Sequence, residues 1–235
     1  MIVDFHSHVL PGIDDGSSSA EESLEMLRMM KEQGISRVVA TPHFYASHDR
    51  PERFLERRDR ALEELLAAIG DEELPAIIPA AEVLYFRGMS RSDALQDLVI
   101  KGTRAILVEM PMGTWTSSMY DELEDIRKYQ GLTPVIAHVD RYISPWRDYG
   151  IPRKLAQLPV LVQANAGFFL RRNTMRKALH MLADDQIQLL GSDCHNITDR
   201  PPNLGAALEV IRTSQGEEAL HVIAGWQKEL LNGIV

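Results

Sequence analysis

The sequence predicts an α/β protein in which parallel strands form a (β/α)7 barrel with helices on the outside. Short runs of apolar and β-branched residues alternate with amphipathic helical patterns, as expected when each strand is followed by a helix. Seven such units fit into the 235 residues, one fewer than in an eight-stranded barrel. Residues able to bind metals also gather where the predicted strands end, which is where such barrels place their active sites.

The predicted strands are short, apolar and separated by helix-length intervals. They cover residues 1–5, 37–41, 77–83, 105–109, 134–137, 160–164 and 188–191. Their richness in Val, Ile, Leu and Ala is typical of strands that are buried between other elements.

Helices are predicted from their caps and from the spacing of apolar residues. The first begins at Ser19-Ala20-Glu21-Glu22, a capping box, and ends at Gly34. The second has Pro51 in its first turn and Gly70 at its end, positions that these residue types favour. A third is expected over residues 117–130, and two or three more close the chain.

Composition and charge exclude several classes of protein. A hydrophobic fraction of 45% is ample for a core, and no linker, repeat or low-complexity tract divides the chain, so we expect a single domain over residues 1–235. The formal net charge of −9 argues against nucleic acid or an anionic membrane surface as the main partner. An anionic substrate therefore needs local cations to overcome the overall field.

Cysteine usage and hydropathy indicate the compartment. The single cysteine, Cys194, excludes an internal disulfide and fits a reducing environment. No basic segment leads into an apolar run as in a signal peptide, and no apolar stretch approaches the roughly 18 residues of a membrane span. We therefore expect a cytoplasmic protein without membrane insertion.

Metal-ligating residue types recur at the predicted strand ends. They are His6, His8, His43, Glu82, Glu109, His138, Asp193 and His195. Any one of them alone is explained as a hydrogen-bonded polar group, but carboxylates gathered at one barrel mouth repel each other unless cations neutralise them. Imidazole and carboxylate without thiolate suit zinc, manganese or iron, and eight ligands suffice for two or three ions. The pattern predicts a multinuclear metal site.

Five segments carry a family resemblance. They are His-Ser-His-x-Leu-Pro-Gly-Ile-Asp-Asp-Gly at 6–16, Ala-Thr-Pro-His at 40–43, His138-x-x-Arg141-Tyr142, Gln163-x-Asn165-Ala166-Gly167 and Ser192-Asp193-x-His195-Asn196. In this order they resemble the PHP (polymerase and histidinol phosphatase) superfamily, and more narrowly its bacterial protein-tyrosine phosphatases of capsule and exopolysaccharide systems. The resemblance covers nearly the whole chain. It implies a distorted (β/α)7 barrel of the PHP type whose trinuclear metal centre hydrolyses phosphotyrosine on a partner tyrosine kinase.

The resemblance also implies a grouping of the ligands. By position, the first metal is held by His6, His8, Glu82 and Asp193; the second by Glu82 as a bridge, Glu109 and His138; and the third by Asp14, His43 and His195. Asp15 is the alternative to Asp14, and both also suit a simple Gly-Ile-Asp-Asp-Gly turn. Manganese is the metal that we expect, with iron or zinc as alternatives.

Two arginines and metal-bound water supply the expected chemistry. Water bound to a metal becomes a nucleophile near neutral pH, and Arg141 and Arg200 are the predicted catalytic residues that bind phosphoryl oxygens. For both arginines an ordinary surface salt bridge is the alternative. The residues do not identify a general acid.

A short motif near the last strand offers a competing nucleophile. Cys194 and Arg200 are separated by five residues, the spacing in the phosphate loop of cysteine-dependent tyrosine phosphatases. Such loops need glycines and free backbone N–H groups around the phosphate. Here the interval contains no glycine but does contain Asp199, and Pro201 follows it. We interpret the spacing as a coincidence.

Departures from the family pattern and the remaining alternatives concern the substrate. The family often has a second histidine where this chain has Phe44, and small residues where it has Phe168 and Phe169. Aromatic residues near the mouth, for which core packing is the favoured interpretation, are Phe44, Tyr45, Trp115, Tyr120, Tyr142, Phe168 and Phe169. A small-molecule phosphatase, such as one acting on histidinol phosphate, and a non-catalytic metal-binding module remain the alternatives. The sequence does not fix the oligomeric state.

Overall fold

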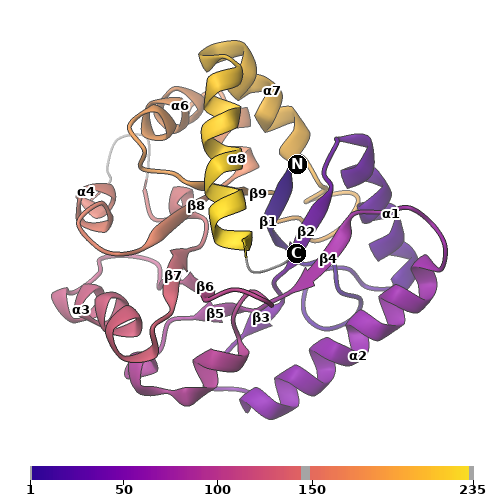
Figure 1. Cartoon of the computed structure of the whole chain (residues 1–235), viewed down its shortest axis with the longest axis horizontal. Helices are drawn as coiled ribbons and strands as arrows, with labels where there is room; N and C mark the ends of the chain where they lie inside the picture. The colour runs from indigo at the N-terminus through magenta and orange to yellow at the C-terminus, as the bar shows by residue number, and fades with distance from the viewer. Residues whose placement is uncertain (1, 144–148, 233–235) are drawn as a thin grey trace.

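Parallel strands form the centre of the molecule, and helices surround them (Figure 1). The computed structural model describes residues 2–143 and 149–232. Met1, where the first strand was expected to begin, lies outside the described residues. The strands are β1 Val3–Ser7, β2 Arg37–Ala40, β3 His43–Phe44, β4 Ala76–Pro79, β5 Glu82–Leu84, β6 Ala105–Glu109, β7 Thr133–Ile136, β8 Leu161–Asn165 and β9 Leu189–Gly191.

The helices connect the strands and cover their outer face (Figure 1). They are α1 Ala20–Glu32, α2 Pro51–Ile69, α3 Ser117–Asp125, α4 Ile151–Leu155, α5 Ala166–Leu170, α6 Met175–Ala183, α7 Leu204–Gln215 and α8 Glu217–Leu231. Short 3-10 turns occur at Met89–Arg91, Asp93–Asp97 and Val139–Arg141. Within the described ranges no helix is long and apolar enough to cross a membrane.

The strands pair in parallel in two sheets that form one curled surface. The first has the order β1-β2-β4 and the second the order β3-β5-β6-β7-β8-β9. The chain passes from β2 to β3 through Pro42 and from β4 to β5 through Ala80 and Ala81, and backbone bonds between the two breaks, such as Ala80 N–H to Ala40 O at 2.8 Å, keep these segments side by side. If β2 with β3 and β4 with β5 each count as one interrupted strand, seven strand positions line the described barrel, as the sequence predicts.

Three details of the predicted elements were wrong. The strand expected over 37–41 ends at Ala40, and the strand expected over 77–83 is interrupted between Pro79 and Glu82. The helix expected over 117–130 is α-helical only to Asp125 and ends in a π-helical turn over Ile126–Gln130.

Only half of the predicted capping box forms at the start of α1. Ser19 Oγ accepts from the Glu22 N–H at 3.3 Å, as expected. The Glu22 carboxylate, however, accepts from the N–H of Ser18 at 2.8 Å and from its hydroxyl at 2.7 Å, one residue earlier than a capping box requires. The N-terminus of the helix is still capped, because the Ser19 hydroxyl satisfies the N–H of Glu22 in the first turn.

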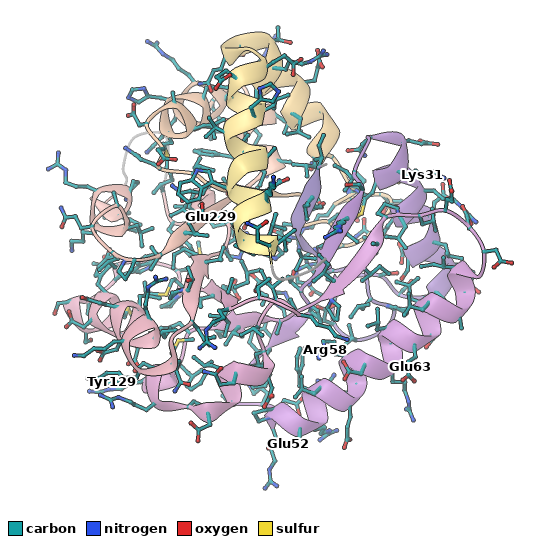
Figure 2. All side chains as sticks on the ribbon, viewed as in Figure 1. Lys31, Glu52, Arg58, Glu63, Tyr129 and Glu229 are labelled. Carbon is teal, nitrogen blue, oxygen red and sulfur yellow. The ribbon has the colours of Figure 1, made fainter. Side chains whose placement is uncertain are left out.

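Apolar residues fill the space between strands and helices and the lower part of the barrel interior. The interior cluster includes Val3, Phe5, Leu107 and Leu189, and Leu231 at the end of α8 packs with it. The outer helices present charged residues to solvent; in Figure 2 Glu52 and Glu63 extend from α2. The buried polar side chains of the interior lie at the carboxyl ends of the strands, next to this apolar cluster.

The last strand meets the first at a narrow seam that closes the barrel. A parallel bridge joins Ser7 to Cys194, and backbone bonds run from His8 N–H to Cys194 O at 2.9 Å and from Asp193 N–H to His6 O at 2.8 Å. A Cβ on Gly191 would lie 2.5 Å from His6 Cβ, so this close approach requires glycine.

Candidate metal centre

The eight metal-ligating residues predicted from strand ends lie together at the carboxyl-terminal mouth of the barrel. Six of them are buried, whereas His43 and Glu109 are partly exposed, with 13% and 18% of their side-chain surface accessible. They come from β1 and the residue after it, from β3, β5 and β6, and from the segments that follow β7 and β9. Since the strands run parallel, their carboxyl ends meet at one edge, which is why residues up to 189 positions apart in the chain converge.

A bulge in β1 directs both of its histidines into the site. Between Asp4 and Ser7 the register shifts by one residue against β2, so β1 holds one residue more than its partner. Phe5 packs in the interior apolar cluster, and His6, its neighbour, nevertheless also faces inward. Strict alternation would place these two side chains on opposite faces. The Nε2 atoms of His6 and His8 lie 3.2 Å apart, consistent with two ligands of one ion.

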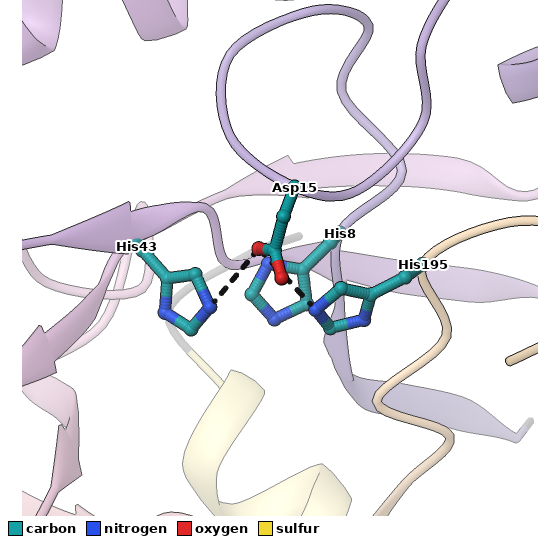
Figure 3. A group of neighbouring side chains, drawn as sticks. All are labelled: His8, Asp15, His43 and His195. Carbon is teal, nitrogen blue, oxygen red and sulfur yellow. Dashed lines mark ion pairs between the residues drawn. The ribbon is translucent and has the colours of Figure 1, made fainter.

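Ligand atoms fall into three overlapping groups, each spanning no more than 4.8 Å. The groups are His8, Asp15, His43 and His195 (Figure 3); His6, His8 and Asp193; and His43, Glu82 and Glu109. His138 adjoins the last group, because its Nε2 lies 2.7 Å from Glu82 Oε1 and 3.5 Å from Glu109 Oε1. This overlap is what a multinuclear centre with shared ligands requires.

Glu82 occupies the middle of the three groups. Its Oε2 lies 3.2 Å from His6 Nε2, 3.4 Å from His8 Nε2 and 3.0 Å from His43 Nδ1, and its Oε1 faces His138. Burial raises the pKa of Glu82, but the charge of His6 and hydrogen bonds from the surrounding imidazoles outweigh that effect and hold the pKa well below its usual range. An ionised carboxylate at this position can bridge two cations.

The two aspartates of the Gly-Ile-Asp-Asp-Gly segment have different surroundings. Asp14 Oδ2 lies 2.8 Å from His8 Nδ1 and accepts from His43 N–H at 3.0 Å, while its Oδ1 accepts from Gly16 N–H at 3.0 Å. Burial raises the pKa of Asp14, but the bond from His8 outweighs it and lowers the pKa to about 2. With both oxygens engaged, Asp14 orients His8 so that Nε2 is free to bind a metal.

Asp15 takes the position that the resemblance gave to Asp14. Its Oδ1 lies 3.4 Å from His43 Nε2 and 3.6 Å from His195 Nε2. Dashed lines in Figure 3 mark these two ion pairs. The geometry therefore favours Asp15, the alternative that the sequence left open. The next position, Gly16, requires glycine, because a Cβ there would lie only 2.3 Å from His8 O.

Both predicted arginines contact the centre. Arg141 pairs with Asp193 Oδ2 and lies 3.8 Å from Glu109 Oε1, and Arg200 Nη2 lies 2.8 Å from Asp193 Oδ1. Their side chains are 33% and 38% exposed, so they stand at the rim rather than in the core. These are not remote surface salt bridges, because both arginines share a carboxylate that belongs to a ligand group.

Strand β8 contributes no ligand but supports three of them, a role that the sequence reasoning missed. The buried Gln163 Oε1 accepts from His138 N–H at 2.7 Å and lies 3.2 Å from His6 Nδ1. Since an amide oxygen only accepts, His6 must carry its proton on Nδ1, which leaves Nε2 for a metal. Gln163 Nε2 donates to Asn165 Oδ1 at 3.1 Å, and Asn165 Nδ2 donates to Asp193 Oδ2 at 2.8 Å. The signal available was the spacing Gln163-x-Asn165 at a strand end, since alternate residues share a face.

Two of the ligand-type residues have backbone conformations that L-residues rarely adopt. His138 has φ 31° and Asp193 has φ 53°, both in the left-handed region. Such strain persists where surrounding contacts fix the residue, and it clusters at functional sites.

The loop after Cys194 does not form a phosphate-binding loop. The N–H groups of Thr198, Asp199 and Arg200 all donate to Asn196 Oδ1, at 3.0, 2.7 and 3.0 Å, so none is free to surround a phosphate. Burial, together with the charge of Asp4, raises the pKa of the Cys194 thiol. A buried neutral thiol is a poor nucleophile.

The donor atoms fit divalent metal ions. Four of the buried atoms have no hydrogen-bond partner within the described chain: Glu82 Oε2, His43 Nδ1, His138 Nδ1 and His195 Nε2. A buried polar atom without a partner costs roughly 1–3 kcal/mol, and cations would compensate this cost for the atoms that they bind. Imidazole and carboxylate without thiolate suit zinc, manganese or iron.

Most of the candidate aromatic residues are buried, and of these the Tyr142 ring lies 5.6 Å from that of His138. Phe44, Trp115, Tyr120, Tyr142, Phe168 and Phe169 are all less than 9% exposed. Tyr45 differs, because it is only partly buried and its ring stacks on His43 with centroids 5.3 Å apart.

Comparisons with known proteins place these features in a family. The tyrosine-protein phosphatase CpsB of Streptococcus pneumoniae is 28% identical over 230 residues, covering 92% of this chain and 91% of that protein. The tyrosine-protein phosphatase YwqE of Bacillus subtilis is 26% identical over 231 residues, covering 94% and 88%.

Solved structures share the fold. A chain from crystal structures of YwqE from Bacillus subtilis and CpsB from Streptococcus pneumoniae, described as metal-dependent tyrosine phosphatases, matches with a TM-score of 0.83 at 23% identity and covers 100% of this chain and 96% of that chain. Histidinol phosphate phosphatase from Lactococcus lactis, complexed with zinc, L-histidinol and phosphate, matches with a TM-score of 0.59 at 13% identity, covering 93% of each.

The family model "Capsular polysaccharide synthesis, CpsB/CapC" matches residues 2–229, nearly the whole chain. The chain belongs to the CpsB/CapC family.

Proposed function

We propose that this protein is a metal-dependent phosphoesterase that hydrolyses phosphotyrosine on a protein substrate during capsular or exopolysaccharide synthesis. The observation that carries the proposal is the convergence of three ligand groups around Glu82, with two arginines on the same mouth. The relatives named as tyrosine-protein phosphatases span most of their own length in the match, which supports the same activity here.

From the ligand groups we infer a role for each residue. His6, His8, Glu82 and Asp193 hold one ion; Glu82, Glu109 and His138 hold a second; Asp15, His43 and His195 hold a third, with Asp14 as the residue that orients His8. Two or three divalent ions, manganese in the first place and iron or zinc as alternatives, supply a Lewis acid and lower the pKa of bound water. The imidazoles and carboxylates fix where those charges lie.

Arg141 and Arg200 bind the phosphoryl group. Each now pairs with Asp193 at the rim, and an incoming phosphate offers oxygens that a guanidinium can bind in a bidentate manner. These two positive charges and the metals overcome the net charge of −9 that otherwise repels a phosphorylated substrate.

The substrate that we propose is a phosphotyrosine-bearing bacterial tyrosine kinase, met in the cytoplasm. Residues 1–235 act as one phosphatase domain in this proposal. No nucleic acid is involved, because the overall charge disfavours it.

A substrate panel with metal reconstitution tests the proposal. The protein is stripped with a strong chelator, reloaded with manganese, iron or zinc, and assayed on a phosphotyrosine peptide and on histidinol phosphate. We expect turnover of the peptide that depends on added metal. Faster turnover of histidinol phosphate would instead indicate a small-molecule phosphatase, and no turnover of either with full metal occupancy would indicate a non-catalytic binding module.

A further inference from the structure

A cavity of about 500 Å³ adjoins the metal centre on the side of β3 and α2. Its lining includes Asp15 and His43, two members of the ligand group that also contains His8 and His195. Its outer part is formed by the loop between β3 and α2 and by the first turns of α2. The lining residues that matter here are Tyr45, His48, Asp49, Arg53 and Arg57.

Nearly every charged group on the cavity wall already has a partner. Asp14 is bonded to His8, and Asp15 lies between His43 and His195. Asp49 pairs with Arg57, which also donates to Ile13 O at 3.3 Å. The three carboxylates of the wall and Arg57 are therefore engaged with neighbouring groups, which leaves one charged residue of the lining.

That residue is Arg53. Over residues 2–143 and 149–232 no ion pair within 4.0 Å joins Arg53 to a carboxylate, and its side chain is exposed at the cavity. It lies one helical turn before Arg57, so both side chains project to the same side of α2. Arg53 thus supplies an uncompensated positive charge in a chain whose overall charge is negative.

The opposite wall is aromatic and connects the cavity to the metal centre. The ring of Tyr45 stacks on His43 at an interplanar angle of 21°, and the ring of His48 meets Tyr45 edge-on with centroids 6.0 Å apart. An extended segment that leaves the metal centre past His43 would run along these rings before reaching Arg53. A cavity of this volume can hold about one or two side chains.

We infer that this cavity is a subsite for residues that flank the phosphotyrosine, and that Arg53 makes it select acidic side chains. The inference rests on the proposed phosphotyrosine phosphatase function. Arg53 acts here as a specificity residue, because it lies away from the ligand groups and from Arg141 and Arg200.

The test compares variants of α2 on matched substrates. Phosphotyrosine peptides carry two glutamates, two glutamines or two lysines on one side or on the other side of the phosphotyrosine, and para-nitrophenyl phosphate serves as a substrate without flanking residues. Arg53→Ala, Arg53→Glu and the control Arg60→Ala are assayed with the same metal loading. Arg60 is an exposed arginine of the same helix that does not line this cavity.

For the wild-type protein we expect a lower KM for an acidic peptide than for its glutamine counterpart, by roughly twofold to fivefold, as for one partly exposed ion pair. Arg53→Ala should abolish this preference at unchanged kcat, and Arg53→Glu should transfer the preference to the lysine peptide. Arg60→Ala should behave as wild type, and added salt should reduce the preference.

The failures of the two proposals are distinguishable. If no protein hydrolyses either class of substrate, the proposed function is wrong. If para-nitrophenyl phosphate is hydrolysed but Arg53→Ala keeps the acidic preference, the subsite is wrong. If Arg53→Ala weakens the small substrate as much as the peptides, the cavity holds the phosphotyrosine itself, and the inference is again overturned.

Discussion

Replacing Gln163 with Leu should disturb the metal centre without removing a ligand. In the structure Gln163 Oε1 accepts from His138 N–H at 2.7 Å and lies 3.2 Å from His6 Nδ1, so Leu leaves two buried donors without an acceptor. Each buried donor left unpaired costs roughly 1–3 kcal/mol, which predicts a loss of roughly 2–6 kcal/mol in the free energy of unfolding of the metal-free protein. His6 is then free to rotate or to change tautomer.

The effect on metal binding follows from the same contacts. Loss of a partner that orients a metal-binding histidine lowers metal affinity by roughly 10–100-fold. Gln163→Glu retains an acceptor for both donors, although it loses the bond to Asn165 and sets a carboxylate oxygen against Asn165 Oδ1, so it should still bind metal more tightly than Gln163→Leu. We expect metal affinity to fall in the order wild type, Gln163→Glu, Gln163→Leu. A general packing defect would not distinguish two substituted side chains of similar size in this way.

Two measurements check this prediction, and neither requires activity. Urea unfolding of the chelated proteins gives the stability term, and calorimetric titration with manganese or zinc gives the affinity. Gln157→Leu, at an exposed position, controls for the change of residue type. Wild-type affinity and stability in Gln163→Leu would falsify the role that we assign to Gln163.

Four further substitutions test the centre. Glu82→Ala should lower turnover by roughly a hundredfold or more and reduce bound metal in elemental analysis, because the bridging carboxylate is lost; normal turnover would mean that Glu82 is no ligand. Asp15→Asn should remove about one ion per chain, whereas Asp14→Asn should retain stoichiometry but weaken affinity by roughly tenfold through His8; the reverse result would restore Asp14 as the ligand. Cys194→Ala should keep most of the activity on phosphotyrosine peptide in steady-state assays, and an inactive variant with full metal content would show that the thiol is the nucleophile.

The strand ends could be predicted from the sequence because they depend on local signals. A buried apolar run followed by His or a carboxylate identifies both a strand and a ligand, and parallel pairing brings such ends together whatever the loops do. His6, Glu82 and His138 were found in this way, and the structure gathers them around one point.

The details that the sequence left open depend on contacts between distant segments. Asp14 and Asp15 are adjacent and chemically identical, and only the position of His8 and His43 relative to the turn separates their roles. The bulge in β1 is likewise a matter of register against β2, which no local pattern records. Gln163 was visible as part of a motif, but its partners lie 25 and 157 residues away.

The seam between β1 and β9 has a consequence for the metal-free protein. Ligand-type residues stand on both sides of it, His6 and His8 on one and Asp193 on the other. An ion held by all three would fasten the two ends of the barrel, and at a hundred times its Kd it would add roughly 2.7 kcal/mol to stability. Chelation should therefore accelerate hydrogen exchange at the amides of His8 and Asp193, while amides between β6 and β7 keep their protection. Loss of the metal would then open the barrel along this one seam, while the pairing of the other strands persists.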